Sequence, residues 1–209
     1  MSKAEKAMRM IGSSSVVLAS AAGFAHAQDV DGFYGGVGVA MTSGDAEGNG
    51  GAFYGTYSLS GGALGSAFAG YNVVSGSGLV FGGEIAVTQG GSIEVGGFYS
   101  ASSVSMGPMI DLKARVGKVF GSTLVYGALG YSLGSIEDYY GGGEKIAKLG
   151  GVSLGGGFET PISENGFIGG DVTMRKLKPQ GDNDYGEPSE NYIDSVDSTT
   201  ISVRIGFRF

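Results

Sequence analysis

Charged side chains recur at every second position in several segments whose alternate positions are apolar. In residues 108–119, for example, Asp111, Lys113 and Arg115 alternate with aliphatic residues. Successive side chains of a β-strand point to opposite faces, so the charges of such a segment share one face. Carboxylates and cations gathered in this way can pair with one another, line an ion path or perform acid–base chemistry. The residues on this face are Glu84, Asp111, Lys113, Arg115, Glu159, Asp171, Arg175 and Arg204, with Arg208 near the end of the chain.

The last twelve residues, 198–209, show this alternation without a break. One face carries Ile201, Val203, Ile205, Phe207 and Phe209, and the other carries both arginines. Such a strand suits a barrel in the bacterial outer membrane, where the apolar face meets lipid and the polar face lines the lumen. A shift by one residue would move Arg204 into lipid, at a cost of roughly 2–4 kcal/mol near the bilayer midplane. The register of this strand is therefore strongly specified.

Eight segments of this kind divide the rest of the chain. Their length suits tilted transmembrane strands, and an even strand number with alternating long and short connections is typical of outer-membrane barrels. We therefore predict an all-β fold, an eight-stranded antiparallel up-and-down transmembrane β-barrel over residues 28–209. The facing of the second and fifth strands is ambiguous. The predicted strands are residues 32–41, 63–73, 79–89, 108–119, 123–133, 149–160, 167–177 and 198–209, and the long polar connections are 42–62, 90–107, 134–148 and 178–197.

The start of the chain predicts export. A basic segment precedes a short apolar run, and Ala25 and Ala27 fit the small-x-small cleavage pattern of a secretory signal peptide. We place cleavage before Gln28, so residues 1–27 form the signal peptide. The alternative, a membrane anchor, is disfavoured because the apolar run is well below the ~20 residues that a spanning helix needs.

Composition excludes several classes of function. The single histidine, His26, lies in the predicted signal peptide, which argues against histidine-dependent catalysis and most transition-metal sites. The formal net charge of −7 argues against nucleic acid as a partner. The absence of cysteine means that stability does not depend on disulfides. We predict no catalytic residue, no cofactor and no metal site.

One acidic connection contains candidate ligands for a cation. Asp182, Asp184, Glu187 and Glu190 offer oxygen ligands suited to Ca²⁺ or Mg²⁺. Their spacing does not match the calcium-loop motif, so a solvated acidic face is the preferred interpretation.

Several motifs carry a family resemblance that covers the whole chain after residue 27. The chain resembles the opacity-type, or porin-family, eight-stranded outer-membrane proteins, which are relatives of the transmembrane domain of outer-membrane protein A. This resemblance implies a monomeric barrel in the cell outer membrane of a Gram-negative bacterium. It also implies that Val203, Ile205, Phe207 and Phe209 form a C-terminal signal for the barrel-insertion machinery. The matching stretches are GFYGGVGVA, GALGSAFAGYNV, GLVFGGEIA, DLKARVG, LVYGALGYS and SVRIGFRF.

The predicted lumen charges have two interpretations. Eight strands enclose a space that side chains just fill, and buried charges must be paired, which favours a filled lumen over an ion path. Glu84 should then lie beside Lys113 or Arg115, and Asp171 near Arg204, because their strands are neighbours in sequence. No substrate pocket is expected, so we predict no enzyme activity.

These observations predict a non-enzymatic barrel that contributes to envelope structure and to surface interaction through its long loops. The alternatives are a small porin-like diffusion channel and a soluble-faced lipid-binding barrel. The expected partners are outer-membrane lipid and lipopolysaccharide, the insertion machinery and a surface ligand bound by the loops. Interfacial aromatic girdles could be formed by Tyr34, Tyr71, Tyr131 and Phe209, with ordinary packing as the alternative for the three tyrosines.

Overall fold

The structure is a computed structural model that describes residues 30–50, 53–95, 102–137, 145–180 and 193–209. These residues form an all-antiparallel β-barrel closed by eight strands, which confirms the predicted fold class. No helix in the described ranges is long and apolar enough to cross a membrane. The barrel strands are β1 (Gly32–Gly50), β2 (Phe53–Val74), β3 (Leu79–Thr88), β6 (Met109–Phe120), β7 (Thr123–Glu137), β8 (Lys145–Pro161), β9 (Gly166–Pro179) and β10 (Ser195–Arg208).

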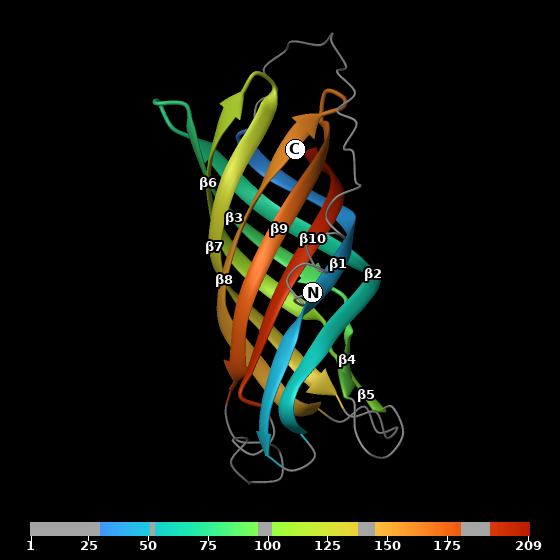
Figure 1. The fold of residues 1–209 in the computed structure, drawn as a ribbon. Helices are drawn as coiled ribbons and strands as arrows, with labels where there is room; N and C mark the ends of the chain where they lie inside the picture. The colour runs from blue at the N-terminus through green and yellow to red at the C-terminus, as the bar shows by residue number, and fades with distance from the viewer. Residues whose placement is uncertain (1–29, 51–52, 96–101, 138–144, 181–192) are drawn as a thin grey trace, which may run out of the picture.

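The first and last strands close the wall. β1 pairs with β10 over most of its length, with Tyr34 opposite Arg208 and Met41 opposite Ile201. The strands run obliquely around the barrel, so those of the front and back walls cross in projection (Figure 1). The alternating C-terminal segment therefore closes the barrel, because it is hydrogen-bonded to β1 on one side and to β9 on the other.

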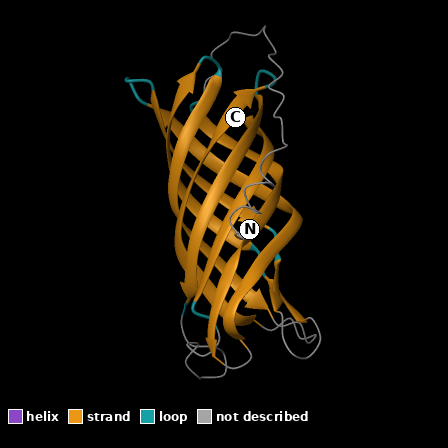
Figure 2. Cartoon of the chain, in the orientation of Figure 1, coloured by secondary structure: helices purple, strands orange, loops and turns teal. Residues whose placement is uncertain are grey.

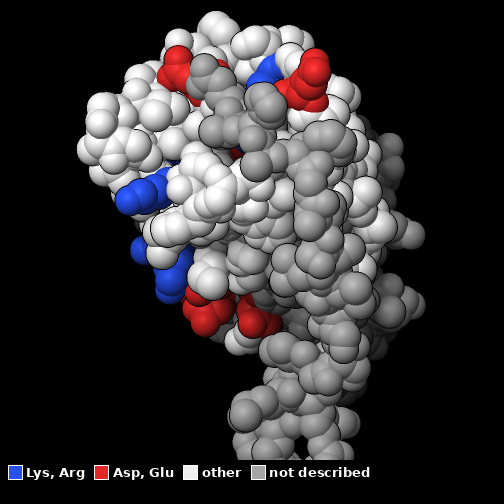
Figure 3. Space-filling model, turned by 90° about the horizontal axis from the view of Figure 1, so that it is seen from above, with Lys and Arg blue, Asp and Glu red and all other residues white. Residues whose placement is uncertain are grey.

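The connections at one end are tight turns, drawn in teal at the top of Figure 2. They join β2 to β3, β6 to β7 and β8 to β9. Gly78 and Gly121 have φ angles of 76° and 65°, a region that glycine adopts without steric cost. Seen from this end, acidic and basic side chains are scattered around the visible rim instead of gathering in one patch (Figure 3).

The connections at the other end differ from the prediction, because much of each segment predicted as a long loop is strand. β1 and β2 remain paired as far as Gly50 and Phe53. Residues 90–107 contain a hairpin of β4 (Ser92–Val95) and β5 (Ser102–Met106), which pairs with β2 and β7. The glycine- and serine-rich composition suggested loops, but apolar side chains at alternate positions turn inward there and are buried, as Ala46 and Leu59 are. The barrel wall is correspondingly taller than predicted.

The structure settles the facing of the two ambiguous strands. On β2, Phe68 points inward and is 7% exposed, whereas Tyr71 points outward and is 42% exposed. On β7, Leu124 and Tyr126 are buried, whereas Leu129 is 63% exposed. Large apolar side chains thus face outward on every barrel strand, and we call the band that they form around the barrel the apolar belt. This is the reverse of a soluble up-and-down barrel, so the soluble-faced alternative does not fit the structure.

Apolar clusters also lie inside the barrel near both ends. Val30, Val80 and Leu124 cluster near the short turns, together with Tyr126. A larger cluster lies inside the opposite end, where β1, β2 and the β4–β5 hairpin continue beyond the predicted strands, and which we call the extended end. Its members are Ala46, Leu59, Met106, Met109, Ile136, Leu149, Leu177, Ile193 and Val196.

Candidate functional site

The structure places every charge predicted for the lumen on the inner face of the wall. Five strands, β3, β6, β8, β9 and β10, supply these side chains. All are buried, with relative exposures of 8% or less. The residues are Glu84, Asp111, Lys113, Arg115, Glu159, Asp171, Arg175, Arg204 and Arg208.

Two arginines and two glutamates form a closed ring of ion pairs. Arg115 on β6 places Nη1 2.9 Å from Glu84 Oε2 and Nη2 2.6 Å from Glu159 Oε1. Arg204 on β10 makes the same contacts, at 2.9 Å to Glu84 Oε2 and 2.6 Å to Glu159 Oε1. Each guanidinium therefore spans both carboxylates, and each carboxylate is held by both guanidiniums. Charge-assisted hydrogen bonds of this length are strong, and the ring braces four strands across the lumen.

Aromatic side chains and a third arginine complete the surroundings of this ring. The Tyr34 hydroxyl donates to Glu84 Oε2 at 3.1 Å and also accepts a short hydrogen bond from Arg115 Nη1. The Arg115 guanidinium carbon lies 3.6 Å from the centre of the Tyr126 ring. Arg208 Nη2 donates to the second oxygen of Glu159 at 2.8 Å. Tyr34 thus lies inside the barrel at 2% exposure, so of its two predicted roles the structure shows interior packing and not an interfacial girdle.

Lys113 and Asp171 form a second group next to the ring. Lys113 Nζ lies 3.4 Å from Asp171 Oδ1, 3.7 Å from Glu84 Oε1 and 3.0 Å from the Thr173 hydroxyl. The Tyr126 hydroxyl donates to Asp171 Oδ2 at 3.1 Å. Glu84 therefore neighbours both Lys113 and Arg115.

Asp171 lies near Arg204, as predicted, because it faces Ser202 in the strand register, but its ion pair is with Lys113. Arg204 lies opposite Gly169 on β9, and Gly169 lies opposite Glu159 on β8. Because Gly169 has no side chain, Arg204 extends across β9 to Glu159, and Asp171 pairs with Lys113 instead.

A third group lies on the side of the extended strands. Arg175 makes a bidentate contact with Asp111, with Nε 2.7 Å from Oδ1 and Nη2 2.6 Å from Oδ2. The Ser132 hydroxyl donates to Asp111 Oδ1 at 2.5 Å, and Arg175 Nη1 donates to the Thr200 hydroxyl at 2.6 Å. Every lumen carboxylate is thus held by at least one cation.

Inward-facing glycines make these long-range contacts possible. Gly70 lies between Tyr34 and Glu84 in the strand register, and the Tyr34 hydroxyl reaches Glu84 across it. Gly157 lies in the same way between Tyr126 and Asp171. A methyl group at Gly157 would lie 2.6 Å from the Tyr126 hydroxyl, closer than real Cβ atoms come. The high glycine content therefore has a specific role in the lumen, which is to let polar side chains reach a partner two strands away.

Among the described residues, this network crosses the lumen from wall to wall. A cavity of about 20 Å³ lies among Glu84, Lys113, Arg175 and Arg204, enough for about one water molecule. Apolar clusters lie inside the barrel toward both ends, so the charges are enclosed between two apolar layers. Among the described residues, no group of three or more histidine, cysteine or carboxylate side chains could hold a metal ion.

The remaining predicted sites lie on the outer face or outside the described residues. The apolar face of the C-terminal strand is exposed, with Val203 at 61%, Phe207 at 55% and Phe209 at 85%. Ile205 belongs to the same face, and the role of this face as an insertion signal stays a prediction. Tyr71 and Tyr131 also face outward. The cleavage residues Ala25 and Ala27 and the acidic stretch Asp182–Glu190 lie outside the described residues.

Sequence reasoning missed the apolar cluster inside the extended end. Ile136, Leu149, Leu177 and Val196 are each at most 1% exposed. All four fall in segments predicted as polar connections or at their edges. The period-two pattern does continue through Leu177 and Val196, and following it past the membrane boundary would have revealed the longer strands.

Comparison with known proteins identifies the family. The chain matches the outer membrane protein β-barrel domain over residues 13–209. The chain belongs to the outer membrane protein β-barrel family. No curated protein sequence matches significantly.

Among solved structures, the barrel is similar to the outer membrane protein OprG from Pseudomonas aeruginosa, with a TM-score of 0.56 and 14% identity over 86% of this chain and 96% of that one. It also matches Neisserial surface protein A, with a TM-score of 0.49 and 16% identity over 86% and 98% of the two chains. Ail, the attachment invasion locus protein of Yersinia pestis, matches with a TM-score of 0.46 and 15% identity over 86% and 99%. At these identities the likeness to OprG shows the fold alone.

Membership of the outer membrane protein β-barrel family places the chain in the outer membrane. Barrels of this kind turn their short connections toward the periplasm and their longer ones outward. By this rule we expect the tight turns at the periplasmic end and the extended strands on the outer side of the membrane.

Proposed function

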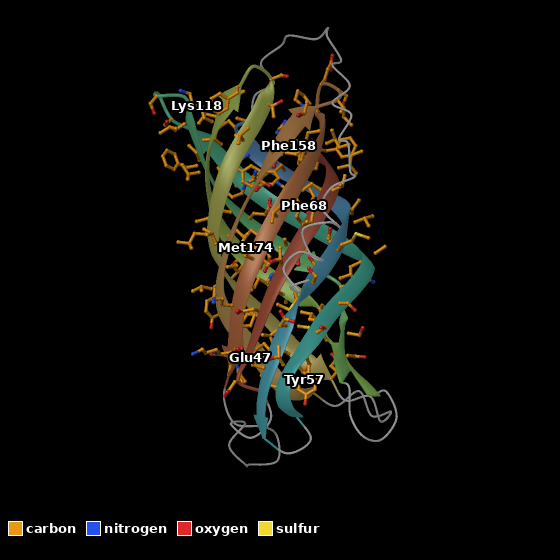
Figure 4. The ribbon with its side chains drawn as sticks, in the orientation of Figure 1. Glu47, Tyr57, Phe68, Lys118, Phe158 and Met174 are labelled. Atoms are coloured by element: carbon orange, nitrogen blue, oxygen red, sulfur yellow. The ribbon has the colours of Figure 1, made fainter. Side chains whose placement is uncertain are left out.

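We propose that this outer-membrane barrel is a closed, non-enzymatic mount that contributes to envelope structure and presents its extended end for interactions at the cell surface. The observation that carries the proposal is the extension of paired strands beyond the apolar belt, around the buried cluster that includes Leu149, Leu177 and Val196. A rigid scaffold that ends in exposed connections is a common arrangement for binding proteins. Glu47 and Tyr57 lie at this end, on the paired strands β1 and β2 (Figure 4).

The lumen supports the same proposal. A diffusion channel needs a continuous aqueous path, and an enzyme needs a pocket that admits substrate. The ring around Glu84 and Glu159 crosses the lumen, and the adjacent cavity of about 20 Å³ is too small for a substrate. Each lumen carboxylate is already held by cations, which leaves none free to act as a general base.

The test separates the two ends of the molecule. In one variant, residues 96–101 and 181–192 are each replaced by an Asn-Gly turn, and every barrel strand is kept. We expect this variant to fold with the heat-dependent electrophoretic mobility of the parent protein. We expect planar-bilayer conductance to be negligible before and after the change. Adhesion of expressing cells to epithelial monolayers should be lost.

A second variant serves as the control for the lumen. Arg115→Ala opens the ring and leaves the extended end unchanged, so adhesion should persist in cells that display folded protein. Steady single-channel currents from the intact barrel that disappear in Arg115→Ala and persist after loop replacement would contradict the proposal. Such currents would establish the diffusion channel instead.

A further inference from the structure

The basic residues on the outer face of the barrel are unevenly distributed. Among the residues whose side chains the structure describes, the arginines all point into the lumen, and the lysines exposed on the outer surface are Lys118, Lys148, Lys176 and Lys178. Lys118 lies at the short-turn end (Figure 4). The other three lie at the opposite ends of β8 and β9, which are neighbouring strands. We call Lys148, Lys176 and Lys178 the lysine cluster.

The strand register brings the lysine cluster together around one glycine. Lys178 lies directly opposite Gly150, and Lys148 precedes Gly150 by two positions on the same strand. Diagonal neighbours of this kind lie roughly 7–8 Å apart, close enough for two ammonium groups to meet one phosphate. A methyl group at Gly150 would lie 2.8 Å from the Tyr131 hydroxyl and 2.9 Å from Gln180 Cγ. The phenol of Tyr131 and the side chain of Gln180 therefore border the same spot, and Gln180 is fixed by a 2.8 Å backbone hydrogen bond to Lys148.

The lysine cluster stands at the outer edge of the apolar belt. Met174 is the outward residue that precedes Lys176 on β9, and Val152 lies opposite Lys176 on β8. Met174 is 56% exposed and Val152 60% exposed. In the outer membrane these two side chains face acyl chains, so the lysines lie at the level of the outer-leaflet headgroups.

The neighbouring part of the outer surface has the opposite charge. Asp197 on β10 lies opposite Asp45 on β1, and both side chains are exposed. Lys176 contacts Asp197 at 3.5 Å, but these side chains are 79% and 57% exposed, and such surface pairs are weak. An anion is therefore attracted to β8 and β9 and repelled from β10 and β1.

We propose that the lysine cluster binds the phosphorylated headgroup of an outer-leaflet glycolipid. The ammonium groups of Lys148 and Lys178 hold the phosphate, and the Tyr131 hydroxyl donates a further hydrogen bond. The acyl chains of the same lipid lie along Val152 and Met174. A free anion would gain only the charge contacts, whereas a lipid gains both, and this combination selects the membrane source. The inference is independent of the proposed surface interaction, because it concerns the barrel wall and not the connections.

The experiment compares two lipids on purified, folded barrel in nonionic detergent micelles. The probes are bisphosphorylated lipid A and the same lipid A after removal of its phosphates, with binding counted by native mass spectrometry. Each lysine near a membrane surface contributes about fivefold to anion binding at low salt. We therefore expect the variant Lys148→Gln/Lys176→Gln/Lys178→Gln to lose roughly 100-fold in affinity for the phosphorylated probe and to bind the dephosphorylated probe as the parent does.

Two further variants make the test specific. Lys118→Gln removes one exposed lysine at the periplasmic end, and its preference for the phosphorylated probe should be unchanged. Tyr131→Phe keeps the ring and should weaken binding severalfold. The proposal is overturned if the triple variant keeps the preference or if Lys118→Gln loses it as strongly. It is also overturned if inorganic phosphate displaces the lipid at equal concentration, because the site would then take a free anion.

Discussion

The membrane-spanning part of the barrel and its extended end distribute polarity in opposite ways. Within the belt, β9 turns Arg175 inward and Met174 outward. A few residues further along, the same strand turns Leu177 inward and Lys178 outward. β10 shows the same reversal, with Arg204 inside and Val203 outside in the belt, and with Val196 buried inside and Asp197 outside beyond it..

This reversal shows that the same strands alternate in lipid and in water, with opposite faces apolar in the two environments. In lipid the apolar face must point outward and the charges must pair inside. In water the order is that of a soluble protein, with an apolar core and a charged surface. The point of reversal therefore marks the level at which each of these strands leaves the lipid at the extended end. This level lies between Met174 and Lys176 on β9 and between Ile201 and Asp197 on β10.

The largest predicted effect comes from breaking the charged region. Glu159 holds Arg115, Arg204 and Arg208, so Glu159→Gln leaves three buried cations with fewer charged partners. Removing one partner of a buried ion pair typically costs about 3–5 kcal/mol. We expect the free energy of unfolding, measured by urea titration of the barrel in micelles, to fall by this amount. Glu47→Gln, at an exposed position on the outer face, is the control, and equal shifts for the two variants would contradict the network.

The next effect tests the apolar region. Leu177 is fully buried inside the extended end, and Leu→Ala in such a core costs about 2–5 kcal/mol because a cavity remains. Leu154 is 61% exposed on the belt, where lipid can fill the vacated space. Leu177→Ala should therefore lower the free energy of unfolding by at least twice as much as Leu154→Ala. If Leu154→Ala is the more damaging change, the extended end is not a water-surrounded core.

The smallest effect concerns the glycines that link the network. A methyl group at Gly70 would collide with the Tyr34 hydroxyl and with the backbone oxygen of Gly83. Overpacking of this kind costs about 1–3 kcal/mol, so Gly70→Ala should destabilise the barrel by that amount. Gly127 faces outward with open space around its Cβ position, so Gly127→Ala should unfold at the parent urea concentration. The idea fails if the two glycine variants are equally stable.

Local pattern was sufficient for the architecture. Alternation identified eight strands, their order and the faces of the charged ones, because a strand with charges on one side can lie in only one register at a lipid surface. It could not settle β2 or β7, where small residues occupy both faces. The sequence-based prediction also placed the ends of several strands at the membrane boundary. Outward-facing residues become polar there, and a stretch without outward apolar residues resembles a loop.

The sequence by itself determined that charges would line the lumen, and only the tertiary structure decided which of them pair. Glu84 on β3 and Arg204 on β10 are 120 residues apart, and β1 and β2 separate them on the wall. Their contact depends on the closure of the barrel and on the way side chains reach across glycines such as Gly169. Neither property is encoded within a strand. Sequence alternation fixes the direction of a side chain, whereas the curvature of the closed sheet fixes what that side chain meets.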